Sequence, residues 1–188
     1  MNLKKILAFA LSAVLAISCT FALIGCSEDP TKVIRDSLTE QLNAYKNADD
    51  SALSQIASLA ENEGLSEMGI DNQEFAVAVL DGFDYSIDDI TVDGKNATAN
   101  VTIISKSYAD FAEKIKVMVD EMSSDASLAD MDADALTALV AERVMDVLNN
   151  TEINTETLAI DYVLNGNEWQ PVAQESAFAS LDSVVFHK

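Results

Sequence analysis

The spacing of apolar positions predicts three helices in the first half of the chain. Asp29 stands before Pro30, an N-cap followed by a first helical position where the missing N–H of proline costs nothing. A second helix is expected from Ser51, after the polar residues 47–50, and a third from Asp71 to Gly82. The apolar residues at helical spacing are Val33, Ile34, Leu38, Leu42 and Tyr45 in the first helix, Leu53, Ile56 and Leu59 in the second, and Phe75, Val79 and Leu80 in the third.

From Phe83 onward the apolar period changes from 3.6 to 2, which predicts strands. A first hairpin is expected over about 83–105, with a slip at Asp89 that indicates a bulge and a turn at 93–96. A second hairpin is expected over about 155–172, because Asn165-Gly166 is a strong two-residue turn signal. The two hairpins together supply about four antiparallel strands.

The residues between the hairpins return to helical spacing, which predicts a helical insertion over about 108–150. Residues 123–130 are polar and are expected to form a mobile link between two helices, and residues 176–186 are expected to form a short closing helix. The fold class is therefore α+β, a single domain over 26–188 with N-terminal helices at about 30–82. The apolar positions of the insertion are Tyr108, Phe111, Ile115, Val119, Met122, Leu136, Leu139, Val140, Val147 and Leu148.

The first 25 residues have the pattern of an export signal: a basic start at Met1–Lys5 and an apolar stretch at Ile6–Ile24. This stretch ends in Leu23-Ile24-Gly25-Cys26, which resembles the lipobox of bacterial lipoproteins. The resemblance implies cleavage before Cys26, acylation of Cys26 and anchoring to the extracytoplasmic face of the cell membrane. Two alternatives remain, an uncleaved membrane-spanning anchor and a second acylation candidate at Cys19, whose position −3 is Ala16.

Charge and cysteine content exclude several classes of protein. The chain has 11 Lys and Arg against 32 Asp and Glu, a net charge of −21, so nucleic acid and anionic lipid are not expected partners. At 49% apolar residues it is too hydrophobic to be disordered throughout. Loss of Cys19 with the signal and acylation of Cys26 would leave the folded domain without a thiol, hence without a disulfide or a cysteine-ligated metal.

The order of these elements resembles that of uncharacterised bacterial lipoproteins whose domain is similar to the nuclear transport factor 2, or cystatin-like, fold. The resemblance rests on the lipobox, on Phe83–Ile87 and Val92–Val101, and on Asn165–Trp169. It implies a curved antiparallel sheet wrapped on helices, and it specifies fold rather than chemistry. The helical insertion at 108–150 departs from the family pattern.

Few residues are candidates for chemistry, and we expect no catalytic residue, cofactor or metal. His187, the only histidine, lies at the end of the chain without predicted partners. Asp130, Asp132 and Asp134 have the spacing that begins a calcium loop, but Ala135 and Ala141 stand where the glycine and glutamate are needed, so helix capping is favoured. Asn96-Ala97-Thr98 matches a glycosylation acceptor and is interpreted as strand composition.

Four aromatic residues could line an apolar pocket in the sheet: Phe83, Tyr85, Tyr162 and Trp169. A core role is the favoured interpretation, and Asp161 cannot share a pocket with Tyr162 because strand neighbours point to opposite faces. We therefore expect a non-enzymatic, membrane-anchored lipoprotein that acts as a binding module for a protein or an apolar small molecule. The alternative is a pocket-based enzyme or a carrier of small apolar ligands with the same fold.

Overall fold

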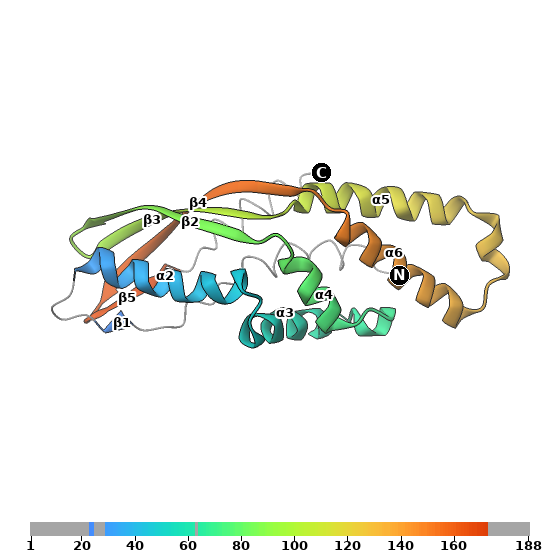
Figure 1. The fold of residues 1–188 in the computed structure, drawn as a ribbon, viewed down its shortest axis with the longest axis horizontal. Helices are drawn as coiled ribbons and strands as arrows, with labels where there is room; N and C mark the ends of the chain where they lie inside the picture. Colours follow the sequence, from blue (N-terminus) through green and yellow to red (C-terminus); the bar gives the residue numbers. More distant parts are fainter. Residues whose placement is uncertain (1–22, 25–28, 63, 173–188) are drawn as a thin grey trace. The chain divides into compact units, whose positions relative to one another are not determined.

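The structure is a computed structural model that describes residues 23–24, 29–62 and 64–172. The chain in it divides into two compact units. The helical unit contains Asn43–Asp84 and Ile104–Thr155, and the sheet unit contains the other described residues. The elements in chain order (Figure 1) are β1 Leu23–Ile24, α2 Pro30–Lys46, α3 Asp50–Asn62, η1 Ser66–Met68, α4 Asn72–Leu80, β2 Asp84–Asp93, β3 Asn96–Lys106, α5 Tyr108–Ser124, η2 Ala126–Asp130, α6 Ala133–Asn149, β4 Ile153–Asn165 and β5 Glu168–Pro171.

The α+β class and both hairpins are confirmed. The sheet has the order β1-β5-β4-β3-β2, and β4 pairs with β5 in antiparallel register with Leu164 opposite Trp169. Both hairpins turn at a glycine in the left-handed region, Gly94 (φ 61°) and Gly166 (φ 66°), a conformation that favours glycine. The sequence did not predict β1, which pairs with β5 through Leu23 opposite Trp169.

In the sheet unit, the first helix is placed by its apolar face and by two long-range hydrogen bonds. Ile34, Leu38 and Leu42 of α2 are fully buried, as the helical spacing predicted. Arg35 Nη1 donates to the carbonyl oxygen of Ile87 at 3.0 Å, and the Tyr85 hydroxyl donates to the carbonyl oxygen of Thr39 at 3.4 Å. Helix α2 therefore packs on β2. The buried sheet positions are Ala97, Ala99, Val101, Ile103, Ile160, Tyr162 and Trp169.

In the helical unit, α3 to α6 enclose a second apolar core. Ile56 of α3 and Phe75 of α4 are buried, as are Phe111 and Ile115 of α5. Asp71 caps α4 as predicted, accepting hydrogen bonds from the backbone N–H groups of residues 73 and 74 at 2.9 and 2.8 Å. The remaining buried apolar residues of these helices are Ala52, Ala60, Ala76, Ala78, Val79, Leu80, Met118, Val140, Ala141, Val144 and Leu148.

Two stretches differ in local structure from what the sequence predicted. The second helix begins at Asp50, not Ser51, because Asp49 accepts hydrogen bonds from the N–H groups of Ser51 and Ala52 at 3.1 and 3.0 Å. Residues 123–130 contain the end of α5 at Ser124 and the short helix η2, which the sequence did not predict and which has Asp125 as its N-cap; that this link is mobile stays a prediction. In both places an aspartate side chain accepts hydrogen bonds from the first N–H groups of the helix, so a polar segment can begin a helix.

Several predictions lie outside the described residues. These are the signal segment apart from Leu23–Ile24, both cysteines, the closing helix at 176–186 and His187. Within the described part of the chain, no helix is both long and apolar enough to cross a membrane.

Candidate functional site

Short polar caps set the limits of the helices that carry the candidate site. Ser107 Oγ accepts from the backbone N–H of Asp110 at 3.3 Å and begins α5. Asp132 accepts from the N–H of Ala135 at 2.8 Å and begins α6. Between them, Asp125 accepts from the hydroxyl of Ser127 at 2.6 Å and from its N–H at 2.9 Å, and these hydrogen bonds, the first above all, lower the pKa of Asp125. The insertion is thus a hairpin of two 17-residue helices joined through η2 (Figure 1).

A polar clamp joins the first turn of α5 to the chain that leaves α6. Asp110 Oδ2 accepts from Lys114 Nζ and from the backbone N–H of Glu152, both at 2.7 Å. Lys114 Nζ also donates to the carbonyl oxygen of Asn150 at 2.7 Å, and the N–H of Ser107 donates to the carbonyl oxygen of Glu152 at 2.6 Å. The pKa of Asp110 is lowered mainly by the hydrogen bond from Lys114 and, to a smaller extent, by that from Glu152. The two helices are therefore held together at this end.

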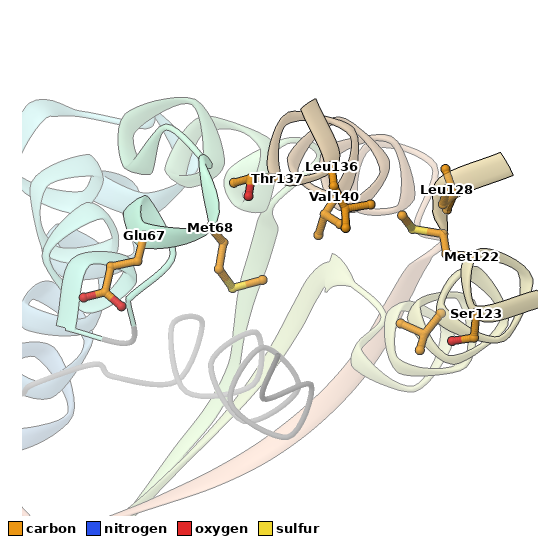
Figure 2. Close-up of a pocket in the computed structure, with 9 residues that line it drawn as sticks. Glu67, Met68, Met122, Ser123, Leu128, Leu136, Thr137 and Val140 are labelled. Carbon is orange, nitrogen blue, oxygen red and sulfur yellow. The ribbon is translucent and has the colours of Figure 1, made fainter. Parts of the chain in front are cut away.

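Toward the other end, the helices and η1 surround an apolar groove of about 480 Å³, called here the α5–α6 groove. Figure 2 shows side chains of Met68, Met122 and Val140 reaching toward one space from η1, α5 and α6. Val140 is buried and the other five apolar side chains are half-buried, so the groove is open to solvent. Its nine lining residues are Glu67, Met68, Val119, Met122, Ser123, Leu128, Leu136, Thr137 and Val140.

The polar groups of the α5–α6 groove are few. Glu67 is the single ionisable residue of the lining, and it is exposed. The hydroxyl of Thr137 donates to the carbonyl oxygen of Ala133 at 2.9 Å, within its own helix. General acid–base or nucleophilic chemistry needs a reactive group with an ionisable partner beside it, and this lining contains no such pair. The arrangement is suited to burying an apolar group instead.

The surroundings of the groove are acidic. Seven of its nine lining residues lie between Lys116 and Arg143, and these 26 residues contain seven Asp or Glu and no Lys or Arg. The other two, Glu67 and Met68, lie in a stretch without a basic residue between Lys46 and Lys95. Arg143 lies close to the groove, because it lines a smaller hollow with Met122 and Leu128, but Glu121 and Asp125 line that hollow too. The excess of acids concentrates cations around the groove.

A second depression, of about 690 Å³, lies in the helical unit over α3 and the start of α4 and has a different character. Glu61 Oε2 accepts from the Ser66 hydroxyl at 2.7 Å and from Asn72 Nδ2, and Asn72 Oδ1 is buried without a hydrogen-bond partner among the described residues. The lining is mostly small and polar, so this surface offers little apolar area to a ligand. Its residues are Ser54, Ala57, Ser58, Glu61, Asn62, Ser66, Ile70, Asp71, Asn72 and Gln73.

The four predicted aromatic residues do not line the α5–α6 groove. Phe83 belongs to the helical unit, is buried and packs against the Tyr45 ring with the centroids 6.0 Å apart. Tyr162 and Trp169 are buried in the sheet unit, where Tyr85 is half-buried. These positions agree with the core interpretation. That the four line a pocket stays a prediction.

The remaining candidates have structural roles. Asp132 caps α6 and Asp134 lies in its first turn, which agrees with the capping interpretation of the aspartate series. Asp130 ends η2, and no group of three or more potential metal-ligating side chains occurs in the described part of the chain. Thr98 of β3 donates to Asp161 at 2.7 Å, and Asp161 is exposed while Tyr162 is buried, so the two do face opposite ways.

Sequence reasoning missed the α5–α6 groove although it singled out several of its residues. Val119 and Met122 were expected in the core, yet Met118 is the buried residue at that end of α5. The available signal was an apolar stripe on α5 wider than one partner helix needs, together with methionines at 118 and 122.

Comparisons with known proteins give one structural similarity. No protein-family model matches the chain, and no curated protein matches it. Among solved structures, the chain is similar to a Bacillus subtilis protein described as a "putative lipoprotein (ycdA)", with 12% sequence identity and a TM-score of 0.44. The match covers 92% of this chain and 54% of that protein, so the chain spans about half of the other protein's length.

Proposed function

We propose that this chain is a bacterial lipoprotein, acylated at Cys26 and held at the extracytoplasmic face of the membrane, whose α5–α6 groove binds an apolar group. The lipobox-like Leu23-Ile24-Gly25-Cys26 supports the anchor. Cleavage before Cys26 would also remove β1 and leave β5 at the edge of a four-stranded sheet. The proposal includes that the domain has the nuclear transport factor 2 fold.

The observation that carries the binding role is the composition of the α5–α6 groove. It offers six apolar side chains in a volume of about 480 Å³, which falls in the range of about 300–1,000 Å³ usual for ligand sites. Two of the six are methionines, whose flexible thioethers adapt to different partners. Binding is favoured over catalysis because the lining has a single ionisable residue.

Methyl NMR tests the binding role without isolating the domain. The full chain, reconstituted in phosphatidylcholine nanodiscs with ¹³C-methyl methionine, is titrated with benzene as a small apolar probe. The methyl resonances of Met68 and Met122 should shift and saturate, because both side chains line the groove. Met131 is exposed and outside the lining, so its resonance is an internal control. Equal shifts at all three methionines, or none, would contradict a binding groove.

The anchor is tested separately by substitution of each cysteine. Cys26→Ala should block processing and abolish labelling by a fatty-acid probe, because the acylated thiol is lost. Cys19→Ala is the matched control and should leave both processing and labelling intact. Labelling that follows Cys19 instead would move the acylation site.

A further inference from the structure

The dimensions of the α5–α6 groove limit what it can hold. Its lining residues from α5, Val119 to Ser123, span about one helical turn, and so do Leu136 to Val140 from α6. A groove about one turn long accommodates side chains rather than a whole polypeptide segment. Two apolar side chains three or four residues apart on a helix lie on one face at a matching distance.

The charge around the groove determines which sign of charge a partner should carry. The helical insertion, Tyr108–Asn150, contains ten Asp and Glu against three Lys and Arg. Lys114 is bound in the clamp at the far end of the hairpin, where it contacts Asp110. Arg143 lies beside Met122 and Leu128, but Glu121 and Asp125 line the same hollow and offset its charge. The net field at the groove therefore repels a carboxylate or phosphate headgroup and attracts cations.

The composition of the groove and its surroundings favours a polypeptide over a fatty acid or an anionic lipid as the occupant. An acyl chain would satisfy the apolar lining, but its anionic head would lie among Glu67 and the acids of residues 117–142, which outnumber Arg143, the base beside Met122 and Leu128. A helix with Leu, Met or Phe on one face and Lys or Arg on the flanks satisfies both conditions. Methionine-lined grooves with acidic borders suit such helices because the side chains can repack.

We propose that the α5–α6 groove binds the apolar face of a basic amphipathic helix from another polypeptide. This inference rests on the proposed binding role of the groove and is independent of the lipid anchor. Two apolar anchors of the partner enter between Met68, Met122 and Val140. Lysine or arginine side chains on its flanks meet the acidic residues of α5, η2 and η1, among them Glu67.

The test compares three probes on the full chain in phosphatidylcholine nanodiscs, with empty discs subtracted. The first is an 18-residue peptide with Leu at helical spacing and Lys elsewhere, the second carries Glu in place of each Lys, and the third is dodecyltrimethylammonium. The basic peptide should bind at least about tenfold more tightly than the acidic one, since its charges are opposite to those of the groove. Its association rate should fall about tenfold between 0.1 and 1 M salt, where the screening length drops from about 10 to 3 Å.

Matched methionine substitutions show whether binding occurs at the groove. Met122→Lys should weaken the basic peptide at least about tenfold, because it places a charge in the apolar lining. Met131→Lys makes the same charge change at an exposed residue outside the lining and should weaken it less than about threefold. Circular dichroism of both variants confirms that they are folded, and Met122→Leu should retain binding.

Each other outcome overturns the inference. Equal binding of the acidic peptide would remove the role of charge, and equal effects of Met122→Lys and Met131→Lys would place binding elsewhere. Tight binding of dodecyltrimethylammonium without the basic peptide would make the occupant a small cationic amphiphile. If benzene shifts the Met68 and Met122 resonances but the basic peptide does not bind, the binding groove stands and the helix partner is refuted.

Discussion

The clamp at Asp110 predicts how strongly the helical hairpin depends on one carboxylate. Asp110→Ala removes the acceptor of two hydrogen bonds, from Lys114 Nζ and from the N–H of Glu152, each 2.7 Å long. The N–H of Glu152 loses a charged acceptor, which costs about 1.5 kcal/mol. The Lys114 side chain is 37% exposed and can turn to water, so its ion pair adds only about 0.5 kcal/mol.

The expected total is a loss of about 2 kcal/mol in the free energy of unfolding, or about 4–8 °C in Tm for a chain of this size. Urea unfolding followed by circular dichroism measures it. Asp110→Asn should lose about half as much, because its side-chain oxygen can still accept from Glu152. Asp36→Ala is the matched control: its pair with Lys32 is also spaced i,i+4 but Asp36 is 61% exposed, so the loss should stay within about 0.5 kcal/mol. A cost for Asp110→Ala no larger than that of Asp36→Ala would refute the clamp.

Three further predictions concern acid stability and packing. Because the pKa of Asp110 is lowered in the folded state, its contribution to stability is present above the unfolded value of 3.8 and is lost as pH falls through the folded pKa. The difference in free energy of unfolding between wild type and Asp110→Ala should therefore be full at pH 7 and shrink in acid, and a difference independent of pH would contradict this. Gly82→Ala should cost about 1–2 kcal/mol, because φ is +80° at Gly82 and the new Cβ, 2.3 Å from Ile153 Cδ1, displaces only the end of an exposed side chain that can change rotamer. Gly94→Ala, at φ +61° with open space around it, should cost about 1 kcal/mol, and a loss for Gly82→Ala above about 3 kcal/mol in urea unfolding would show that Ile153 cannot move aside. Ile115→Ala, at a fully buried site, should cost about 2–5 kcal/mol, and Val117→Ala, at 51% exposure on the same helix, should cost less than about 0.5 kcal/mol. Calorimetry that ranks the two losses the other way would disprove the assigned buried face of α5.

The sequence alone determined the elements of this protein, because the signals that form them are local. Helical and strand periods, the cap at Asp71, the cap at Asp132 and the glycine turns at Gly94 and Gly166 each act within a few residues. The acidic character and the lipobox-like residues around Cys26 are likewise sequence properties. The start of α3 and the helix η2 were not predicted, because in each case an aspartate side chain, Asp49 or Asp125, caps the helix from a polar segment.

Only the tertiary structure decided which apolar residues are covered and which are left to bind. Ile115 and Val119 lie one turn apart on α5, yet Ile115 is fully buried while Val119 is half-buried in the lining of the groove. A hydrophobic pattern marks the face of a helix that avoids water, but it does not say how far a neighbour extends along that face. The contribution of Met68 from η1, far from α5 and α6 in the chain, depends on how the helical unit packs. Such a groove forms where segments that are distant in the sequence pack together, and the spacing of residues within one segment does not predict that packing.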